Sequence, residues 1–200
     1  MLTRLKNKVR GLVHKSKKEL TFAETKLNTV IGPIKVKLLP GATIPKYMTD
    51  GSAGIDLVAH NFIALYDGQE EKNIARITQN TVKSNKGYVT LRHGERLLVG
   101  TGLFMEIPEG YELQVRDRSG NSLKKGLKVF NSPGTIDSDY RGEIGVILWN
   151  TNMHSMLRIE LGERIAQGIF LQIERPDFFD STDISTTSRG EGGFGHTGSK

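Results

Sequence analysis

The stretch HGERLLVGTGLFMEIPEGYELQVR, residues 93–116, decides the fold. Its apolar residues alternate or cluster over about four to eight positions on both sides of the turn at 108–111, as in short β-strands. Similar runs recur at residues 34–39, 88–93, 143–150, 155–161 and 164–174. Because many short strands come with scarcely one convincing long helix, the sequence predicts an all-β domain: a sandwich, a barrel or a jelly roll.

The composition limits the chemistry that the chain can perform. Its 200 residues, 36% hydrophobic and 25% charged, fit one globular domain with appendages. The absence of cysteine excludes disulfides, thiolate metal sites and a cysteine nucleophile. No apolar run approaches the roughly 18 residues of a membrane span, and none has the pattern of a secretory signal peptide. We therefore expect a soluble intracellular protein with no membrane partner, cytoplasmic by default.

The excess positive charge lies at the N-terminus. Residues 1–32 hold eight Lys or Arg against two Glu, which accounts for the whole formal net charge of +6. Apolar side chains stand at roughly helical spacing among the basic ones, so this segment is interpreted as a basic N-terminal extension. It is a solvated extension, a targeting peptide, or a site for nucleic acid or anionic membrane, and an organellar address stays open.

Two further stretches depart from the β pattern. Residues 64–87 are polar and turn-rich, which is typical of an insertion in the β domain that we place at 33–176. Residues 177–188, DFFDSTDISTTS, form a Ser/Thr/Asp-rich linker. The linker would let the rest of the segment 177–200, which is glycine-rich, move as an arm. Segments 1–32 and 64–87 either bind a protein or nucleic-acid partner or are neutral surface elaborations, and the neutral interpretation is favoured.

The stretch GTIDSDYRGEIGV, residues 134–146, carries a pair of carboxylates, Asp137 and Asp139. A turn that leads into a hairpin can hold a carboxylate at the mouth of a pocket and leave backbone groups free to read a planar ligand. Turn formation is the commoner use of Asp at such positions. The pair alone therefore leaves a catalytic and a structural role open.

Two other stretches have the composition of phosphate and nucleotide contacts. In RDRSGNSLKKG, residues 116–126, Arg118, Ser119 and Gly120 follow a predicted strand, and a cation, a hydroxyl and an accessible amide suit phosphate oxygens. In RGEGGFGHTGSK, residues 189–200, glycines expose amides to anions and Phe194 can stack on a base. Taken singly, these strings also fit a plain turn and a flexible chain end.

Together, five stretches resemble in their order the five motifs of the trimeric deoxyuridine triphosphatases, the dUTPases. These stretches are SAGIDLVA (52–59), RDRSGNS (116–122), GTIDSDYRGEIGV (134–146), GERIAQGIF (162–170) and RGEGGFGHTGS (189–199). The resemblance covers roughly residues 33–62 and 89–200. It implies a jelly-roll-like β subunit, a homotrimer whose active sites are shared between subunits, and a mobile C-terminal arm that closes over the nucleotide.

The reaction that this resemblance implies is hydrolysis of dUTP to dUMP and diphosphate, with a water attacking the α-phosphorus. Asp137 matches the general base that orients this water. Tyr140 matches the residue beneath the deoxyribose that leaves no room for a 2′-hydroxyl. Asn131, with main-chain groups of Gly134 and Ile136, matches the part of the family's site that reads uracil.

The resemblance also assigns the phosphate end of the site. Arg118, Ser119 and Gly120 match the phosphate-binding turn, and Gln167 matches a further phosphate contact. Asp56 matches the acidic position that organises the metal and the triphosphate, which it would do indirectly, through water. The implied cofactor is Mg²⁺, held largely by phosphate oxygens and waters, so no complete protein metal site is expected.

The arm supplies the last group of implied contacts. Arg189 would approach the γ-phosphate, Phe194 would stack on uracil, and Gly193, Gly195 and Thr197 would contribute backbone or hydroxyl contacts. A lid that wraps a triphosphate needs backbone conformations that residues with a Cβ resist, which is a reason for its many glycines.

The sequence departs from the family pattern at several positions. Asp117 stands where proline is frequent, and Asn121 and Ser122 replace a small apolar pair, so packing around the phosphate turn is expected to differ. His196 stands where serine is frequent. The connection at 64–87 is roughly two dozen residues longer than is usual in the family.

Two alternatives stay open beside dUTP hydrolysis. A dCTP deaminase shares the fold and the phosphate turn and uses a glutamate in the hairpin region, where this chain has Glu143. The sequence GTIDSDYRG and the complete glycine-rich arm match the hydrolase better. A catalytically silent, nucleotide-gated binding protein is the second alternative, and the presence of Asp137, Tyr140, Arg189 and Phe194 argues against it.

Overall fold

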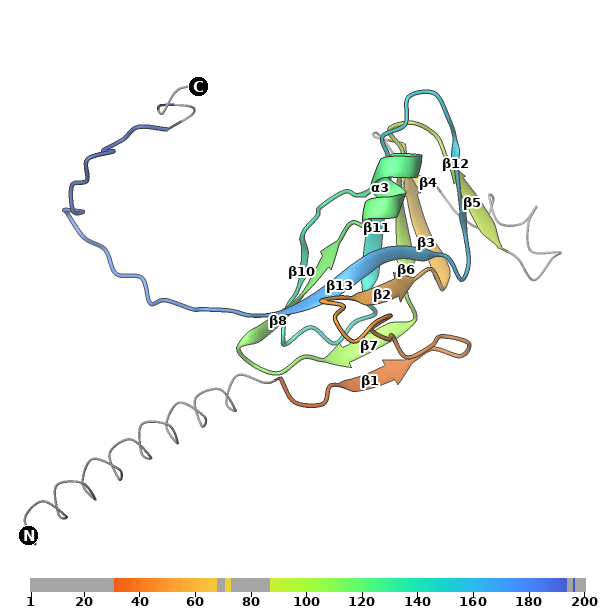
Figure 1. The fold of residues 1–200 in the computed structure, drawn as a ribbon, viewed down its shortest axis with the longest axis horizontal. Coiled ribbons are helices and arrows are strands. Elements are labelled where there is room, and N and C mark those ends of the chain that lie inside the picture. Colours follow the sequence, from red (N-terminus) through yellow and green to blue (C-terminus); the bar gives the residue numbers. More distant parts are fainter. Residues whose placement is uncertain (1–30, 68–70, 73–86, 194–195, 197–200) are drawn as a thin grey trace, which may run out of the picture.

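A computed structural model describes residues 31–67, 71–72, 87–193 and 196 of the chain. These residues fold into a mostly β body, from which the C-terminal segment extends (Figure 1). Every strand pairing is antiparallel. The mostly β prediction is therefore confirmed.

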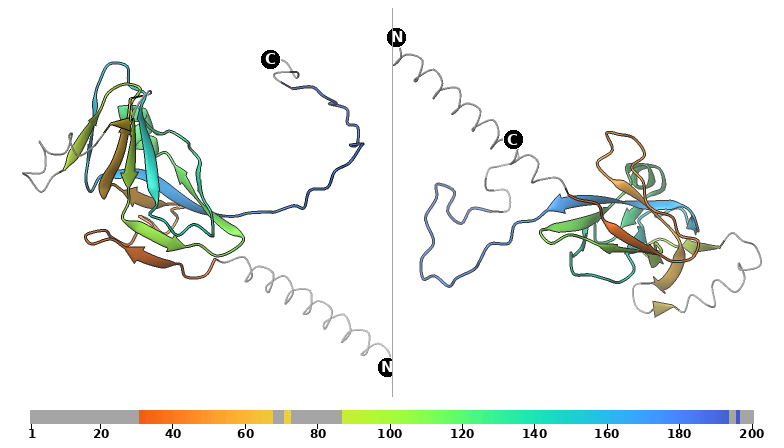
Figure 2. Two further views of the ribbon diagram at one scale, coloured as in Figure 1. Left: turned by 180° about the vertical axis from the view of Figure 1, so that it is seen from behind. Right: turned by 90° about the horizontal axis from the view of Figure 1, so that it is seen from below.

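Two large sheets form most of the body, and the views from behind and from below show the strands crossing around a common interior (Figure 2). The first has the order β10 (Gly134–Ile136), β8 (Tyr111–Arg116), β13 (Arg164–Gln172) and β2 (Ile55–Val58). The second has the order β4 (Glu71–Lys72), β3 (Asn61–Tyr66), β6 (Arg96–Gly100), β11 (Gly145–Asn150) and β9 (Leu127–Val129). Most neighbours are distant in sequence, so the sheets bring separate motifs side by side.

Two small sheets complete the body. Strand β1 (Lys35–Leu38) pairs with β7 (Leu103–Glu106), and β12 (Leu157–Glu160) pairs with β5 (Tyr88–Leu91). The described part of the chain contains no helix long and apolar enough to cross a membrane.

The core follows from the alternation seen in the sequence. In β6 the side chains of Leu97 and Val99 are fully buried, and in β8 the same holds for Leu113, while the intervening residues are half-buried. Period-two alternation places such residues on one face of a strand. Each buried Leu or Val contributes about 1.5–3 kcal/mol relative to exposure, which stabilises the sheets that carry the site.

The short helix α3 (Ser119–Lys125) is among the elements that the sequence pattern did not predict, as are strands β3, β9 and β10. It begins after Arg118, whose backbone is extended, and ends at Gly126 with φ 69° in the left-handed region. Glycine adopts that conformation without a steric penalty and commonly ends helices. Lys124 and Lys125 in the last turn interact favourably with the helix dipole. The sequence suggested only a turn here because seven residues are too few for a helical period.

Candidate active site

A pocket of about 370 Å³ lies between β2, β13 and the start of α3. The functional groups in its lining include those of Asp56, Arg118, Ser119, Gly120, Arg164 and Gln167. The sheet explains the grouping, because Asp56 stands opposite Gln167 in the β2–β13 pair, and Gln167 stands opposite Arg116 in the β13–β8 pair. The five predicted phosphate-end residues thus lie in one pocket, and Arg164 joins them.

Two arginines hold the Asp56 carboxylate. Arg118 Nε donates to Oδ1 at 2.8 Å, and Arg164 Nη1 donates to Oδ2 at 3.0 Å. The Asp56 side chain is only 16% exposed, so these pairs are better shielded than ion pairs on an open surface. Two guanidinium groups face one carboxylate, which leaves this pocket with an excess of positive charge.

Strand β13 is irregular at the edge of the pocket, where its register with β2 shifts between Arg164 and Ala166. Two carbonyls at this shift accept hydrogen bonds from the phosphate turn. Arg118 Nη1 and Asn121 Nδ2 both donate to Arg164 O at 3.1 Å, and Asn121 Nδ2 is also 3.4 Å from Ile165 O. An irregularity of this kind frees backbone groups from the ladder and redirects side chains. The hydrogen bonds to these two carbonyls hold the phosphate turn against β13.

Asp117, which stands where the family often has proline, fixes the other side of the turn. Its Oδ1 accepts the Val129 N–H at 2.5 Å, and its Oδ2 pairs with Lys128 Nζ at 2.8 Å. Its carbonyl accepts a hydrogen bond from Gln167 Nε2 at 2.7 Å. In place of a rigid proline ring, this chain positions the turn by hydrogen bonds to β9 and β13.

The first turn of α3 leaves backbone donors at the pocket. The Ser122 N–H is the first to reach a helical acceptor, Arg118 O at 3.0 Å, so the N–H groups of Ser119, Gly120 and Asn121 precede it. Such groups have no acceptor within a helix and can bind phosphate oxygens. Ser119 and Gly120 are exposed, and a Cβ built on Gly120 would meet nothing within 4 Å.

The hairpin that follows β9 carries the predicted base and sugar contacts. The side chains of Asn131 and Asp137 are exposed, Ile136 is half-buried against the core, and Gly134 lies buried beneath Asn131. A Cβ on Gly134 would lie 3.0 Å from Asn131 Nδ2, tighter than most contacts of this kind. The absence of a Cβ at residue 134 therefore leaves room for the Asn131 side chain.

Tyr140 is held by the hairpin itself. Its hydroxyl donates to Glu143 O at 3.0 Å, and its ring lies close over Gly142, where a Cβ would come within 2.3 Å of the hydroxyl oxygen. Residue Tyr140 is 44% exposed. One face of Tyr140 is therefore fixed against the backbone while the remainder is accessible to a ligand.

The Glu143 side chain has a structural task. Its Oε1 accepts the Gly102 N–H at 2.7 Å, and the Asn61 amide, turned so that its nitrogen faces Glu143, donates to the same oxygen at 2.9 Å. A Cβ on Gly100 would collide with both side chains. Because this carboxylate is committed to bracing β3, β6 and the turn before β7, it is poorly placed to act as the glutamate of a deaminase.

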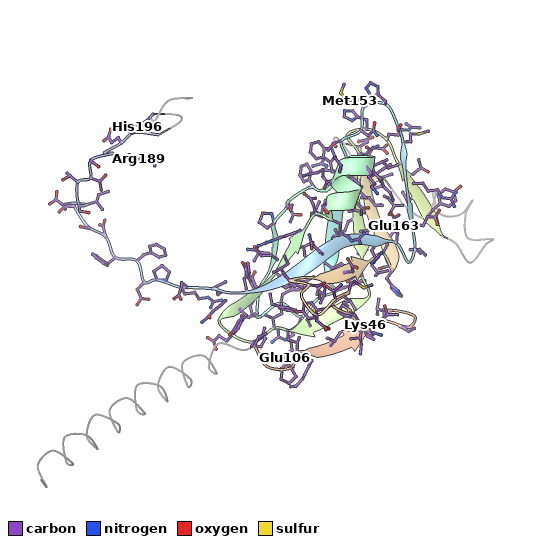
Figure 3. All side chains as sticks on the ribbon, in the orientation of Figure 1. Lys46, Glu106, Met153, Glu163, Arg189 and His196 are labelled. Atoms are coloured by element: carbon purple, nitrogen blue, oxygen red, sulfur yellow. The ribbon has the colours of Figure 1, made fainter. Side chains whose placement is uncertain are left out.

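The hairpin residues do not line the pocket that holds Asp56 and Arg118. The arm is also apart from it in this structure. Figure 3 shows Arg189 and His196 on the extended segment, well away from Glu163 in the β body. Arg189 Nε donates locally, to Gly192 O at 2.7 Å, and Gly193 is exposed. The three further arm positions predicted as contacts lie outside the described residues: Phe194, Gly195 and Thr197.

The pocket fits a magnesium ion carried by a substrate better than one bound directly by the protein. Within the described ranges, no group of three or more His, Asp or Glu side chains is arranged to hold a metal. Each oxygen of Asp56 already accepts a hydrogen bond from a guanidinium group, which leaves this carboxylate better suited to a contact through water than to direct coordination. Magnesium retains water readily and suits an outer arrangement in which phosphates supply the direct ligands.

Comparison with known proteins settles the family. The dUTPase family model matches residues 81–198, more than half of the chain. The chain belongs to the dUTPase family. It is 44% identical over 165 residues to the deoxyuridine 5′-triphosphate nucleotidohydrolase of Fusobacterium nucleatum, covering 82% of this chain and 96% of that protein. The enzyme of the same name from Hydrogenobaculum is 42% identical over 164 residues, covering 82% and 96%.

Solved dUTPase structures agree with the fold. A mutant of the Staphylococcus bacteriophage 80alpha dUTPase with dUpNHpp aligns with a TM-score of 0.64 and 25% identity, covering 84% of this chain and 99% of that chain. A mutant dUTPase from phage phi11 of S. aureus aligns with a TM-score of 0.56 over 76% and 98%, and at 20% identity this likeness concerns the fold alone. The chain is a hydrolase of nucleotide metabolism, a dUTP diphosphatase, as its motifs predicted.

Three residues in and around the pocket were not recognised from the sequence: Arg164, which lines it, and Asp117 and Asn121, which fix the turn beside it. Arg164 lies in the same GERIAQ stretch as Gln167, three residues earlier, and that proximity was the available signal. Asp117 and Asn121 stood out only as departures from the family pattern. Their partners come from other strands and could not be read from spacing.

Proposed function

We propose that this dUTPase converts dUTP to dUMP and diphosphate by in-line attack on the α-phosphorus of a water that Asp137 orients. The reaction would limit uracil incorporation into DNA and supply dUMP. The observation that carries the proposal is the pocket in which Asp56, Arg118 and the first turn of α3 combine positive charge with backbone donors. That combination suits a triphosphate chain.

The separation of the pocket from the hairpin supports a shared active site. Asp137 and Tyr140 belong to a matched motif, as the pocket residues do, but they do not line the pocket of their own chain. We therefore propose a homotrimer of jelly-roll-like subunits in which the hairpin of one subunit faces the phosphate pocket of another. The arm of residues 177–200 would close over the nucleotide, bringing Arg189 and Phe194 to it.

Base and sugar selection would come from the hairpin. Asn131 and the main-chain groups of Gly134 and Ile136 would pair with uracil, and fixed donors and acceptors would refuse the reversed pattern of cytosine. The Tyr140 ring, held over Gly142, would occupy the space that a 2′-hydroxyl needs. Base selection and sugar selection would thus both be made by residues of the same hairpin.

Asp137 has the freedom that a general base needs. Its side chain is exposed, and no hydrogen bond within the described residues commits its carboxylate. A carboxylate within hydrogen-bond reach can accept the proton as water attacks. Bound magnesium would neutralise part of the charge of the triphosphate. In this chain, Arg118, Ser119, Gly120 and Gln167 would hold the phosphates, with Asp56 placed to meet the hydrated ion through water.

The test uses the purified protein and its Asp137→Asn variant with each dNTP and with UTP, with and without Mg²⁺, while dUMP and diphosphate are measured. We expect turnover of dUTP alone, dependent on Mg²⁺, and a loss of about 10²–10⁴-fold in kcat in the variant. Its thermal unfolding should match the wild type, because Asp137 is exposed. A variant with near-normal kcat would refute the role of Asp137, and turnover of UTP at the same rate would refute the sugar selection.

The interpretations of the two accessory segments, residues 1–32 and 64–87, stay predictions. The N-terminal extension at 1–32 lies outside the described residues except for its last two, and so does most of 64–87. For each segment a protein or nucleic-acid partner and a neutral surface elaboration stay the two alternatives, of which the neutral one is favoured. We propose the cytoplasm as the compartment, in keeping with the family's usual setting. Deletion of residues 73–86, which leaves strands β3 and β4 in place, tests for a partner at the insertion, because turnover should persist while a partner interaction is lost.

A further inference from the structure

We propose that Met48 is a site of reversible oxidation, at which a hydroperoxide converts the thioether to a sulfoxide and thereby weakens the binding of a phosphate chain. The inference rests on the proposed function in one respect, namely that the pocket of Asp56 and Arg118 receives the phosphates of dUTP. Met48 precedes the first of the five matched motifs and belongs to none of them.

All the sulfur atoms of this chain belong to methionine. The sequence has five methionines and no cysteine, so thioethers are the side chains that an oxidant can modify at sulfur and that a reductase can restore. Met1 lies outside the described residues, and Met105 is buried in the core. The other three are exposed, Met48 at 61%, Met153 at 74% and Met156 at 66%. An oxidant in solution therefore reaches these three.

Met48 differs from the other two exposed methionines in its position. It lines the pocket between β2, β13 and α3, and it is the largest apolar side chain among the described residues of that lining. Met153 and Met156 belong to the loop between β11 and β12 and do not line this pocket. Figure 3 shows Met153 well separated from Lys46, which stands two residues before Met48. Of the three, oxidation of Met48 therefore changes the phosphate pocket.

The backbone is fixed on both sides of Met48. On one side, Tyr47 forms an antiparallel bridge with Ile55. On the other side, the turn from Thr49 to Ser52 is closed, because the Thr49 N–H donates to Ser52 Oγ at 3.1 Å and the Ser52 N–H donates to Thr49 O at 3.0 Å. The Met48 side chain therefore starts from a defined point at the wall of the pocket.

The oxidation adds one oxygen atom to the sulfur. The Met48 sulfur attacks an oxygen of hydrogen peroxide, the O–O bond breaks as the S–O bond forms, and the leaving hydroxide takes the remaining proton and departs as water. The sulfur loses two electrons and the peroxide gains them. A thiol-dependent methionine sulfoxide reductase reverses the change by supplying two electrons and releasing the oxygen as water.

A sulfoxide at this position opposes the binding of an anion. Oxidation converts an apolar side chain into a polar one, and the sulfoxide oxygen carries a negative partial charge and only accepts hydrogen bonds, as phosphate oxygens do. The two groups repel each other and compete for the same donors, which are Arg118, Arg164 and the first turn of α3. Loss of about one hydrogen bond to the ligand weakens its binding by roughly 2–10-fold.

The experiment treats the wild type, Met48→Leu and two matched controls, Met153→Leu and Met156→Leu, with hydrogen peroxide, and peptide mass spectrometry measures the sulfoxide at each methionine. The KM of each protein for dUTP after treatment is divided by its own value before treatment. We expect a ratio of roughly 2–10 for the wild type and the two controls, and a ratio near one for Met48→Leu. Methionine sulfoxide reductase should restore the wild-type KM. An equal rise in Met48→Leu, or an unchanged KM in a wild type whose Met48 is oxidised, overturns the inference.

Protection by a ligand connects the modification to the pocket. Inorganic triphosphate should slow the oxidation of Met48 and leave that of Met153 unchanged, because Met48 alone of the two lines the pocket. Equal rates at Met48 with and without triphosphate would contradict the inference. A Met48 that stays unmodified while Met153 and Met156 are oxidised would contradict it as well.

A binding measurement keeps this test apart from the test of catalysis. Inorganic triphosphate is titrated calorimetrically into untreated and oxidised wild type and into Met48→Leu treated in the same way, with folding checked by circular dichroism. Binding that oxidation weakens in the wild type and not in Met48→Leu supports the inference even if dUTP is left intact, in which case the proposed function alone fails. Equal binding by untreated and oxidised wild type refutes the inference even if dUTP is hydrolysed.

Discussion

The phosphate pocket and the hairpin of residues 131–143 treat their functional side chains differently. In the pocket, Asp56, Arg118 and Gln167 are each held by hydrogen bonds to other strands or to the turn before α3. In the hairpin, Asn131 and Asp137 are exposed, and their side chains make no hydrogen bond within the described residues. The side chains of the pocket are held by hydrogen bonds within their own chain, whereas Asn131 and Asp137 of the hairpin are not.

The difference follows from what each region must do. A highly charged phosphate chain is bound best by donors and charges that need no rearrangement, because reorganisation would consume binding energy. A carboxylate that orients water must stay free to accept a proton, so it cannot be tied to a cation in advance. The pocket is therefore preorganised within one chain, whereas under the proposed function the hairpin would acquire its partners from substrate or from a neighbouring subunit.

Gly142→Ala should disturb the hairpin and spare the pocket. The added Cβ would fall within 2.3 Å of the Tyr140 hydroxyl, so the ring must move and its bond to Glu143 O is lost. We expect kcat/KM for dUTP to fall on the order of 10²-fold, the cost of misplacing a substrate by about 1 Å. The preference for dUTP over UTP should fall as well. Steady-state kinetics with both nucleotides measures this.

The control for this change is Gly51→Ala, where a Cβ would meet nothing within 4 Å. Diphosphate inhibition should stay normal in Gly142→Ala, because the phosphate pocket is untouched. If diphosphate binding fell together with selectivity, the two regions would be coupled in the free enzyme, and the pocket would not be fixed independently of the hairpin.

Two asparagines allow the comparison to be made with one residue type. Asn121 is buried and donates to the carbonyls of Arg164 and Ile165, whereas Asn131 is exposed. Asn121→Ala leaves two carbonyls without this donor, so the free energy of unfolding should fall by about 1–3 kcal/mol. Asn131→Ala should leave it within about 0.5 kcal/mol of the wild type and weaken dUTP binding instead.

Urea denaturation measures the first effect, and KM for dUTP measures the second. The pattern would be refuted if Asn131→Ala proved the more destabilising of the two. An Asn121→Ala protein with normal stability would show that the carbonyls at the register shift are satisfied in another way, by water for example.

The sequence predicted the strands and most of the site for a physical reason. Alternation over β6 and β8 depends only on neighbours along the chain, and so does the order of the five motifs. Asp56, Arg118 and Gln167 were predicted as site residues because they belong to those motifs, and the structure brings them into one pocket.

What the sequence could not supply was the set of long-range partners. Helix α3 is too short to show a period, and its position depends on Asn121 reaching carbonyls more than forty residues away. The bulge-like shift at Arg164 and the use of Glu143 as a brace depend on strand register. Such contacts follow from topology, which local patterns do not determine.

Ser122 offers the smallest and sharpest test of the pocket's construction. It stands where the family has a small apolar residue, and its hydroxyl oxygen is buried with no hydrogen-bond partner within the described residues. A buried polar atom without a partner costs free energy, and Ala is also the better helix former. We expect Ser122→Ala to raise the free energy of unfolding by about 0.5–1.5 kcal/mol.

Ser119→Ala, on the exposed first turn of the same helix, isolates the contribution of helix propensity, so urea denaturation of both variants separates the two causes. A Ser122→Ala protein less stable than the wild type would mean that the hydroxyl has a partner in solution, and that this departure from the family pattern is a tie of the phosphate turn like those made by Asp117 and Asn121.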